Sequence, residues 1–192
     1  TSVTSAGCTR LNVEGYGGMN MATWLDRPLT VAGRVLLRTE DGVETRLVHL
    51  DRDLLVIPSL AIHMQRDVNR GHEYNPQIDM QPLWGPAEGR TLTDLLCEEL
   101  GVAAADILDR DLQLVVRQTP ARIGPDGEFF LAPRIDDLEC AAATLLAFLD
   151  AAAETDSACA PVWAMLDNEE VGSSSRQGAQ SSFLRDVLDR IL

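Results

Sequence analysis

Two clusters of acidic residues have the types and spacing that hydrolytic chemistry needs. Asp136-Asp137 follows a short apolar run and opens an Ala- and Leu-rich stretch, and Asp167-Asn168-Glu169-Glu170 follows a second apolar run. Carboxylates gathered in one crevice repel each other unless a cation lies among them. Divalent metal ions would relieve this repulsion, and two of them roughly 3.5–4 Å apart are a common arrangement in hydrolases. Of two adjacent glutamates, one can then bind metal while the other accepts a proton from metal-bound water.

The periodicity around these clusters predicts the elements that must position them. We expect strands over 128–132 and 161–167 and helices over 136–153 and 173–192. Strand, helix, strand and helix at this spacing are typical of a parallel α/β sheet, whose carboxyl edge holds ligand sites. Asp136, Glu169 and Glu170 would then share one crevice. The alternative is that these acidic residues only stabilise helix N-termini through the helix dipole.

The middle of the chain shows a different pattern, that of antiparallel strands. The predicted elements are strands over 29–38, 44–50, 53–57 and 112–118, and a helix over 91–100 between Thr91 and Gly101. A polar stretch rich in Pro and Gly over 67–90 is predicted to be a long loop. The sequence therefore predicts a β-rich module followed by an α/β portion.

Composition excludes several classes of partner. The 192 residues carry a formal net charge of −14, and all 16 basic residues are Arg. Such a surface repels polyanions, so we expect neither nucleic acid nor anionic membrane as a partner. No apolar run reaches the roughly 18 residues that a membrane span needs. The cysteines, which form no C-x-x-C pair, favour a reducing and hence cytoplasmic location; they are Cys8, Cys97, Cys140 and Cys159.

The three histidines offer one candidate for the site. His49 lies in a strand pattern and is expected to be structural. His72-Glu73 begins like a helical zinc motif, but Pro76 stands where the second histidine would be required. His63 follows an apolar run at the edge of the polar loop, which is a suitable place for a site residue.

Several blocks of the sequence resemble one enzyme family. The segment 167–173, which reads DNEEVGS, together with QGA at 177–179, is similar to the D-[NH]-E-E-V-G-S…Q-G-A signature of the aspartyl aminopeptidase family. Further blocks at 15–18, 23–27, 32–35, 57–66 and 132–138 resemble that family's motifs in the same order. The resemblance therefore covers nearly the whole chain.

The resemblance implies a fold and an activity. The family's α/β catalytic domain carries an inserted β-rich dimerisation domain, and its dimers build a dodecamer. Residues 1–28 would then belong to the catalytic domain, 29–127 to the inserted dimerisation domain and 128–192 to the α/β catalytic portion. The expected activity is a metallo-aminopeptidase that hydrolyses N-terminal Asp or Glu residues from peptides, in a homo-oligomer.

The resemblance also implies roles for four residues. Asp136 would bridge two Zn²⁺ ions, Glu170 would bind one of them, and Glu169 would be the general base. His63 would reach a neighbouring subunit's active site and stabilise the transition state. Carboxylate ligands also accept Mn²⁺ or Co²⁺.

The chain matches the central part of the family's sequence and lacks the family's other metal ligands. It is therefore expected to be inactive alone and to bind zinc weakly. Two other interpretations stay open, which are a catalytically inactive assembly module and a related dinuclear aminopeptidase with neutral specificity.

Overall fold

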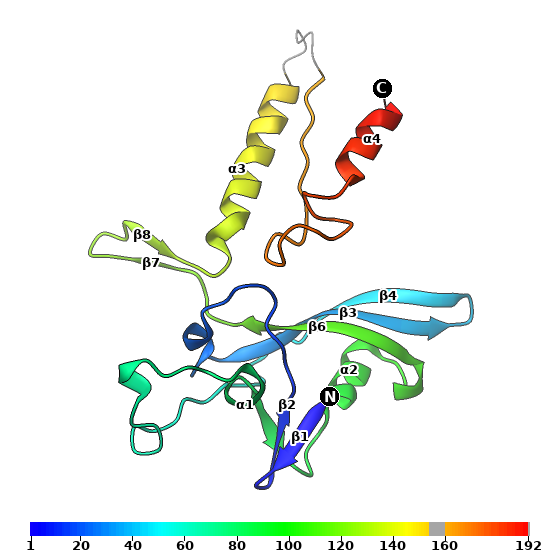
Figure 1. Cartoon of the computed structure of the whole chain (residues 1–192). Helices are drawn as coiled ribbons and strands as arrows, with labels where there is room; N and C mark the ends of the chain where they lie inside the picture. The colour runs from blue at the N-terminus through cyan, green and yellow to red at the C-terminus, as the bar shows by residue number, and fades with distance from the viewer. Residues whose placement is uncertain (154–159, 192) are drawn as a thin grey trace. The chain divides into compact units, whose positions relative to one another are not determined.

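The computed structural model describes residues 1–153 and 160–191, and it shows a mixed α/β protein. The chain divides into two compact units, which are described separately (Figure 1). Unit 1 comprises Thr1–Glu14 and Asn20–Thr119, and unit 2 comprises Gly15–Met19 and Pro120–Leu192. Of the four cysteines, Cys159 lies outside the described residues.

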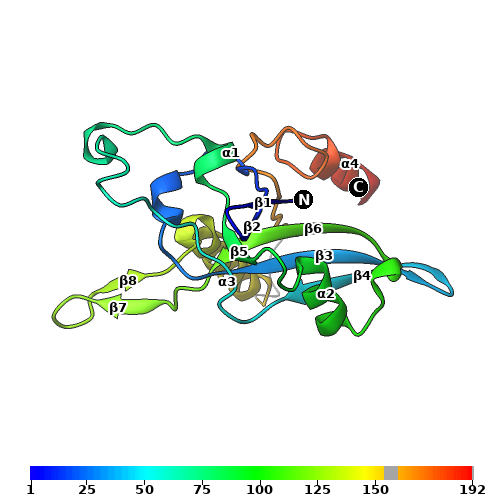
Figure 2. The same ribbon diagram turned by 90° about the horizontal axis from the view of Figure 1, so that it is seen from below.

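The main sheet of unit 1 contains three antiparallel strands in the order β4-β3-β6 (Figure 2). They are β3 (Leu29–Thr39), β4 (Gly42–His49) and β6 (Ile107–Val116). All three were predicted, but β6 begins five residues earlier than the pattern at 112–118 suggested. The first residues of β6 show no alternation of polar and apolar side chains, because several of them are charged and exposed. This end of the strand is defined by its pairing with β3 and not by burial.

The core of the protein lies in unit 1 and is built around β3. Leu29, Val35 and Leu37 are at most 1% exposed, as expected for one face of a half-buried strand. The predicted strand at 53–57 is not a full strand, because it makes only single bridges to neighbouring segments. Its buried residues Leu55 and Ile57 nevertheless complete the core at the beginning of β3.

Helix α2 (Leu92–Leu100) confirms the helix predicted at 91–100. The Thr91 Oγ1 atom accepts a hydrogen bond from the Asp94 backbone N–H at 3.1 Å, and the Asp94 carboxylate accepts one from the Thr91 N–H at 2.8 Å. This reciprocal pair is a capping box. Gly101, at φ +66°, ends the helix in the left-handed region.

A second sheet of unit 1 was not predicted. It contains β1 (Ser2–Ser5), β2 (Cys8–Leu11) and β5 (Leu83–Pro86) in the order β1-β2-β5. The strands are only four residues long, which is too short for a readable alternation of polar and apolar residues. The short helical elements of unit 1 are η1 (Met21–Trp24), η2 (Val68–Arg70), α1 (Pro76–Asp79) and η3 (Ala104–Asp106).

The stretch at 67–90 is therefore not a loop throughout, since η2, α1 and β5 lie within it. Pro76 in fact favours α1, because a proline suits the first turn of a helix. The Asn75 side chain caps the same turn by accepting a hydrogen bond from the Gln77 N–H at 3.0 Å.

Unit 2 contains a short hairpin and two helices. The hairpin pairs β7 (Ala121–Ile123) with β8 (Phe129–Leu131), and the helices are α3 (Ile135–Ala152) and α4 (Phe183–Ile191). A turn at 124–127 joins the two hairpin strands, with the Gly127 N–H donating to the Gly124 carbonyl oxygen at 3.2 Å. No helix of the described residues is long and apolar enough to span a bilayer.

The parallel α/β unit predicted at the end of the chain is not formed within the described residues. β8 pairs only with β7, and antiparallel, while 161–167 belongs to no strand. An apolar segment becomes a strand only beside another strand, and none lies beside this one. Trp163 instead donates its indole N–H to Thr144 Oγ1 of α3 at 3.1 Å.

The last helix begins ten residues later than predicted. Ser173 adopts a left-handed conformation at φ +59°, which a helix does not tolerate, and its carbonyl oxygen accepts a hydrogen bond from the Gln180 N–H at 3.1 Å. The stretch 173–182 is therefore a folded turn region and α4 follows it.

Unit 2 exposes much of its apolar surface. Every buried apolar side chain of the described core lies in unit 1, whereas Phe130, Leu146 and Met165 of unit 2 are each at least 63% exposed. The chain exposes 14231 Å² in all, while two separate compact units of the same total mass would expose about 11,000 Å². The described residues of unit 2 therefore form no buried apolar core.

Candidate catalytic carboxylates

Glu169 and Glu170 lie on a tightly folded turn of unit 2. The Asp167 N–H donates to the Gln177 carbonyl oxygen at 3.1 Å, and the Ser173 N–H donates to the Asn168 carbonyl oxygen at 2.9 Å. Gly178 is buried against this fold, since a Cβ atom there would lie 2.1 Å from the Ser173 carbonyl oxygen. The backbone is thus fixed while the two carboxylates are exposed to solvent.

Asn168, the residue before the two glutamates, holds this turn through its side chain. Its backbone is left-handed at φ +63°, a conformation that asparagine tolerates better than most residues. Its Nδ2 atom donates to Ser175 Oγ at 2.7 Å, and its Oδ1 atom accepts a hydrogen bond from the Tyr16 hydroxyl at 2.6 Å. Sequence reasoning gave Tyr16 no role, because it stood only within the block at 15–18 that resembles the family's motifs.

Asp136 lies at the irregular beginning of α3. Its backbone is extended at φ −80° and ψ 116°, and the Asp136–Asp137 peptide bond is cis. The side chain is exposed. Asp136 is therefore presented from a kink and not from a regular helical turn.

The described carboxylates do not by themselves form the predicted metal site. In residues 1–153 and 160–191, no group of three or more His, Cys, Asp or Glu side chains is placed to hold a metal ion. Asp136, Glu169 and Glu170 thus do not form such a group by themselves. A zinc site needs about four ligands, so these residues could supply part of a donor set but do not complete it.

His63 belongs to unit 1, in a turn where its side chain is exposed. The turn is closed by the Met64 N–H, which donates to the Ala61 carbonyl oxygen at 2.8 Å. Ser59 lies just before this turn. Its Oγ and its backbone N–H donate hydrogen bonds to the Asp26 carboxylate, at 2.6 Å and 2.9 Å. The hydroxyl bond and then the backbone bond hold the pKa of Asp26 below its usual value and anchor the beginning of the segment that carries His63.

The other two histidines, His49 and His72, also lie in unit 1. His49 is exposed on β4. His72 stacks edge-on against Tyr74, with 4.9 Å between ring centroids, and its Nε2 atom lies 3.9 Å from the Asp79 carboxylate.

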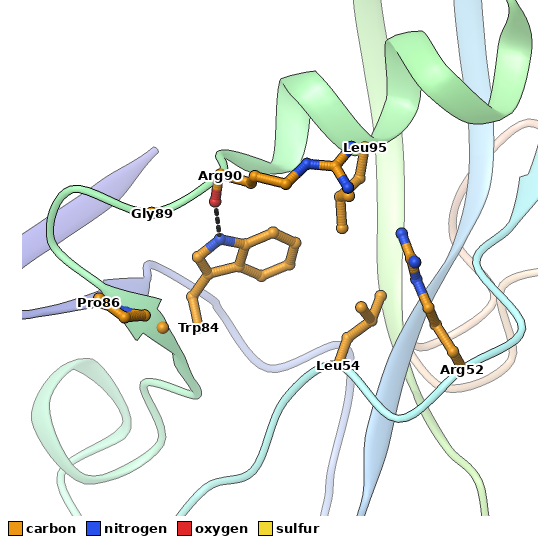
Figure 3. A pocket seen from close by; sticks show the side chains of 8 residues that line it. Arg52, Leu54, Trp84, Pro86, Gly89, Arg90 and Leu95 are labelled. Atoms are coloured by element: carbon orange, nitrogen blue, oxygen red, sulfur yellow. Dashed lines mark hydrogen bonds between the residues drawn. The ribbon is translucent and has the colours of Figure 1, made fainter.

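Unit 1 contains a pocket whose lining includes none of these candidates (Figure 3). The indole N–H of Trp84 donates to the Arg90 carbonyl oxygen at 2.6 Å, and the Arg90 guanidinium pairs with Glu98. The pocket is lined by Arg52, Leu54, Trp84, Gly85, Pro86, Gly89, Arg90 and Leu95. Because none of these carries a carboxylate, imidazole or thiol, the pocket is not a metal site.

Comparison with known proteins gives a consistent match. A family model described as "Aminopeptidase I zinc metalloprotease (M18)" matches residues 1–192. The chain is 42% identical over 190 residues to a probable M18 family aminopeptidase 2 of Clostridium acetobutylicum, covering 95% of this chain and 43% of that protein.

Two solved structures are similar along nearly the whole chain. Ape4 in a cryo-EM complex with Nbr1 matches with a TM-score of 0.88 and 35% identity, over 99% of this chain and 41% of that one. The mApe1 dodecamer of S. cerevisiae matches with a TM-score of 0.77 and 27% identity, over 98% and 44%. The chain thus spans less than half the length of the relatives that it matches.

Proposed function

The chain belongs to the M18 family of zinc metallo-aminopeptidases, and on that premise we propose that the protein containing it removes N-terminal Asp or Glu residues from peptides by hydrolysis. The observation that carries the proposal is the turn of Asn168–Ser173, which presents two adjacent carboxylates on a fixed backbone. The acidic specificity rests on the likeness of segments 167–173 and 177–179 to the aspartyl aminopeptidase signature.

The proposed roles follow the positions of the carboxylates. Glu169 accepts a proton from the attacking water and returns it to the leaving amine. Asp136 and Glu170 would supply oxygen ligands to the metal ions. Among the described residues, no hydrogen bond or ion pair engages the Glu169 or Glu170 side chain, so both carboxylates are free for these roles.

Zinc, when bound, would polarise the scissile carbonyl group and lower the pKa of water. Because the described residues do not complete a zinc site, further ligands are required from outside them. His63 is proposed to act at the active site of a neighbouring subunit, for which its exposure on unit 1 is suitable.

The proposal extends to assembly and location. A homo-oligomer in which dimers build a dodecamer is supported by the dodecameric structure of S. cerevisiae mApe1. A cytoplasmic location is supported by Cys8, Cys97 and Cys140, which are free thiols.

The test uses the natural gene product that contains residues 1–192. We expect zinc-dependent release of Asp and Glu from peptides that begin with them, and much slower release of Leu. Replacing the general base in Glu169→Gln should lower kcat by about 10²–10⁴-fold at unchanged zinc content. Activity that survives both chelation and Glu169→Gln would overturn the proposal, and equal rates for Asp and Leu would overturn its acidic specificity.

A second candidate function is a catalytically inactive assembly module. The observation that favours it is the lack of a complete metal site in the described part of the chain. Size-exclusion chromatography of the 192-residue chain would distinguish it, because a clean monomer at high micromolar concentration would argue against autonomous assembly.

A further inference from the structure

The segment Gly15–Met19 is attached to the turn that carries the two glutamates. Its flanking residues Glu14 and Asn20 belong to unit 1, yet the five residues themselves group with unit 2. The connection to neighbouring residues of unit 1 therefore does not explain why Gly15–Met19 groups with unit 2. Two specific contacts with the turn of Asn168–Ser173 do.

The first contact is the hydrogen bond from the Tyr16 hydroxyl to Asn168 Oδ1, at 2.6 Å across 152 residues of sequence. The other end of the same amide donates to Ser175 Oγ at 2.7 Å. These two hydrogen bonds, one at each end of the amide, hold the Asn168 side chain in place. They thereby stabilise the left-handed backbone of Asn168, directly before Glu169.

The second contact is a close approach of two backbones. Gly17 adopts φ +71°, and a Cβ atom placed on it would lie 2.3 Å from the Glu170 carbonyl oxygen. Only glycine fits there, for both conformation and space. At neighbouring Gly18, an added Cβ would meet nothing within 4 Å. The need for glycine is thus specific to the residue that faces Glu170.

We propose that Tyr16 and Gly17 form a clamp that positions Glu169 and Glu170 for the hydrolytic reaction, an inference that rests on the function proposed above. Neither residue contacts substrate in this role. Tyr16 acts through the Asn168 side chain, and Gly17 acts by letting the two backbones meet. Both are positioning residues, and their loss should lower turnover more than substrate binding.

The first experiment measures hydrogen exchange in the natural gene product containing residues 1–192. It compares wild type with Tyr16→Phe, Gly17→Ala and the matched control Gly18→Ala. The amides of Gly172 and Ser173 report directly, because they donate to the Glu169 and Asn168 carbonyl oxygens. We expect about 3- to 10-fold faster exchange in Tyr16→Phe, the effect of one lost hydrogen bond, a larger increase in Gly17→Ala, and none in Gly18→Ala.

The second experiment measures kinetics in the same variants with an Asp-initiated peptide. Tyr16→Phe should lower kcat by about 3- to 10-fold, with KM and zinc content unchanged. A double-mutant cycle with Asn168→Ala tests the route of the effect. If Tyr16 acts through Asn168, Tyr16→Phe should have no further effect once Asn168 has been truncated.

The outcomes separate the clamp from the proposed function. Exchange that is unchanged in both Tyr16→Phe and Gly17→Ala overturns the clamp, whatever the activity. Faster exchange with unchanged kcat overturns its role in catalysis. If the wild-type protein has no peptidase activity, the proposed function is overturned, and the catalytic role of the clamp with it. Faster exchange in Tyr16→Phe and Gly17→Ala would then still show the clamp as a structural contact.

Discussion

Two leucine-to-alanine substitutions test whether the two units differ in packing as the structure shows. Leu96 of α2 is 0% exposed, whereas Leu146 of α3 is 63% exposed. Truncating a fully buried leucine removes its transfer free energy and leaves a cavity, at a cost of about 2–5 kcal/mol. Leu96→Ala should lower the free energy of unfolding of unit 1 by that amount.

The same change at Leu146 should have a much smaller effect. With 63% of the side chain exposed, about a third of a leucine's burial, or about 0.5–1 kcal/mol, is at stake. The higher helix propensity of alanine offsets part of this loss. We therefore expect Leu146→Ala to change the unfolding free energy by less than about 1 kcal/mol.

The assay is urea unfolding of the 192-residue chain, followed by circular dichroism and by tryptophan fluorescence. Trp84 lies beside Leu95 in the pocket of unit 1 and reports on that unit (Figure 3). Trp163 is bonded to Thr144 of α3 and reports on unit 2. Equal losses in Leu96→Ala and Leu146→Ala would refute the reasoning, because α3 would then be packed as tightly as α2.

Three further predictions concern local contacts. Thr91→Ala should lower the unfolding free energy by about 1 kcal/mol by removing the cap of α2, and Thr91→Ser should retain most of it, as urea unfolding would show. The pKa of Asp26 is lowered in the folded state, so its contribution to stability is present above the unfolded pKa and disappears as the pH falls through the folded pKa. Asp26→Asn should therefore destabilise the chain at pH 7, and the loss should shrink as the pH falls through the folded pKa of Asp26. A difference in melting temperature between wild type and Asp26→Asn that stays constant over the acid range would contradict this. Isothermal titration of the 192-residue chain should show no zinc affinity tighter than micromolar, and a nanomolar site would contradict the incomplete ligand set.

The sequence predicted elements whose signals are local. Strand β3 alternates apolar residues over eleven positions, and α2 carries its own cap at Thr91 and its own stop at Gly101, so both were found. The strands β1 and β2 are only four residues long and form a tight hairpin, whose pairing with distant β5 no local pattern predicts. The segment 161–167 has the composition of a buried strand, but composition cannot supply the neighbouring strand that it needs.

The candidate site shows the same division between local and distant signals. Glu169 and Glu170 stand out because their motif is contiguous, and the boundaries given for the domains stay predictions. The contact between Tyr16 and Asn168 joins residues 152 positions apart, and no local pattern predicts it. Two features require a glycine at position 17. One is its φ of +71°, which is typical of a turn, and the other is the close approach of the Glu170 backbone, which only the three-dimensional structure shows.

The exposed apolar surface and the carboxylates proposed as metal ligands occur in the same unit. Unit 1 buries its own core around β3, while unit 2 exposes apolar side chains along β8, α3 and α4. The carboxylates proposed for the chemistry, Asp136, Glu169 and Glu170, also lie in unit 2, and the described residues do not complete a metal-binding group around them. A surface that covers α3 and completes the ligand set would remedy both deficits at once. Folding of unit 2 and metal binding should therefore be coupled, since each zinc ligand contributes only when the backbone that carries it is held in place.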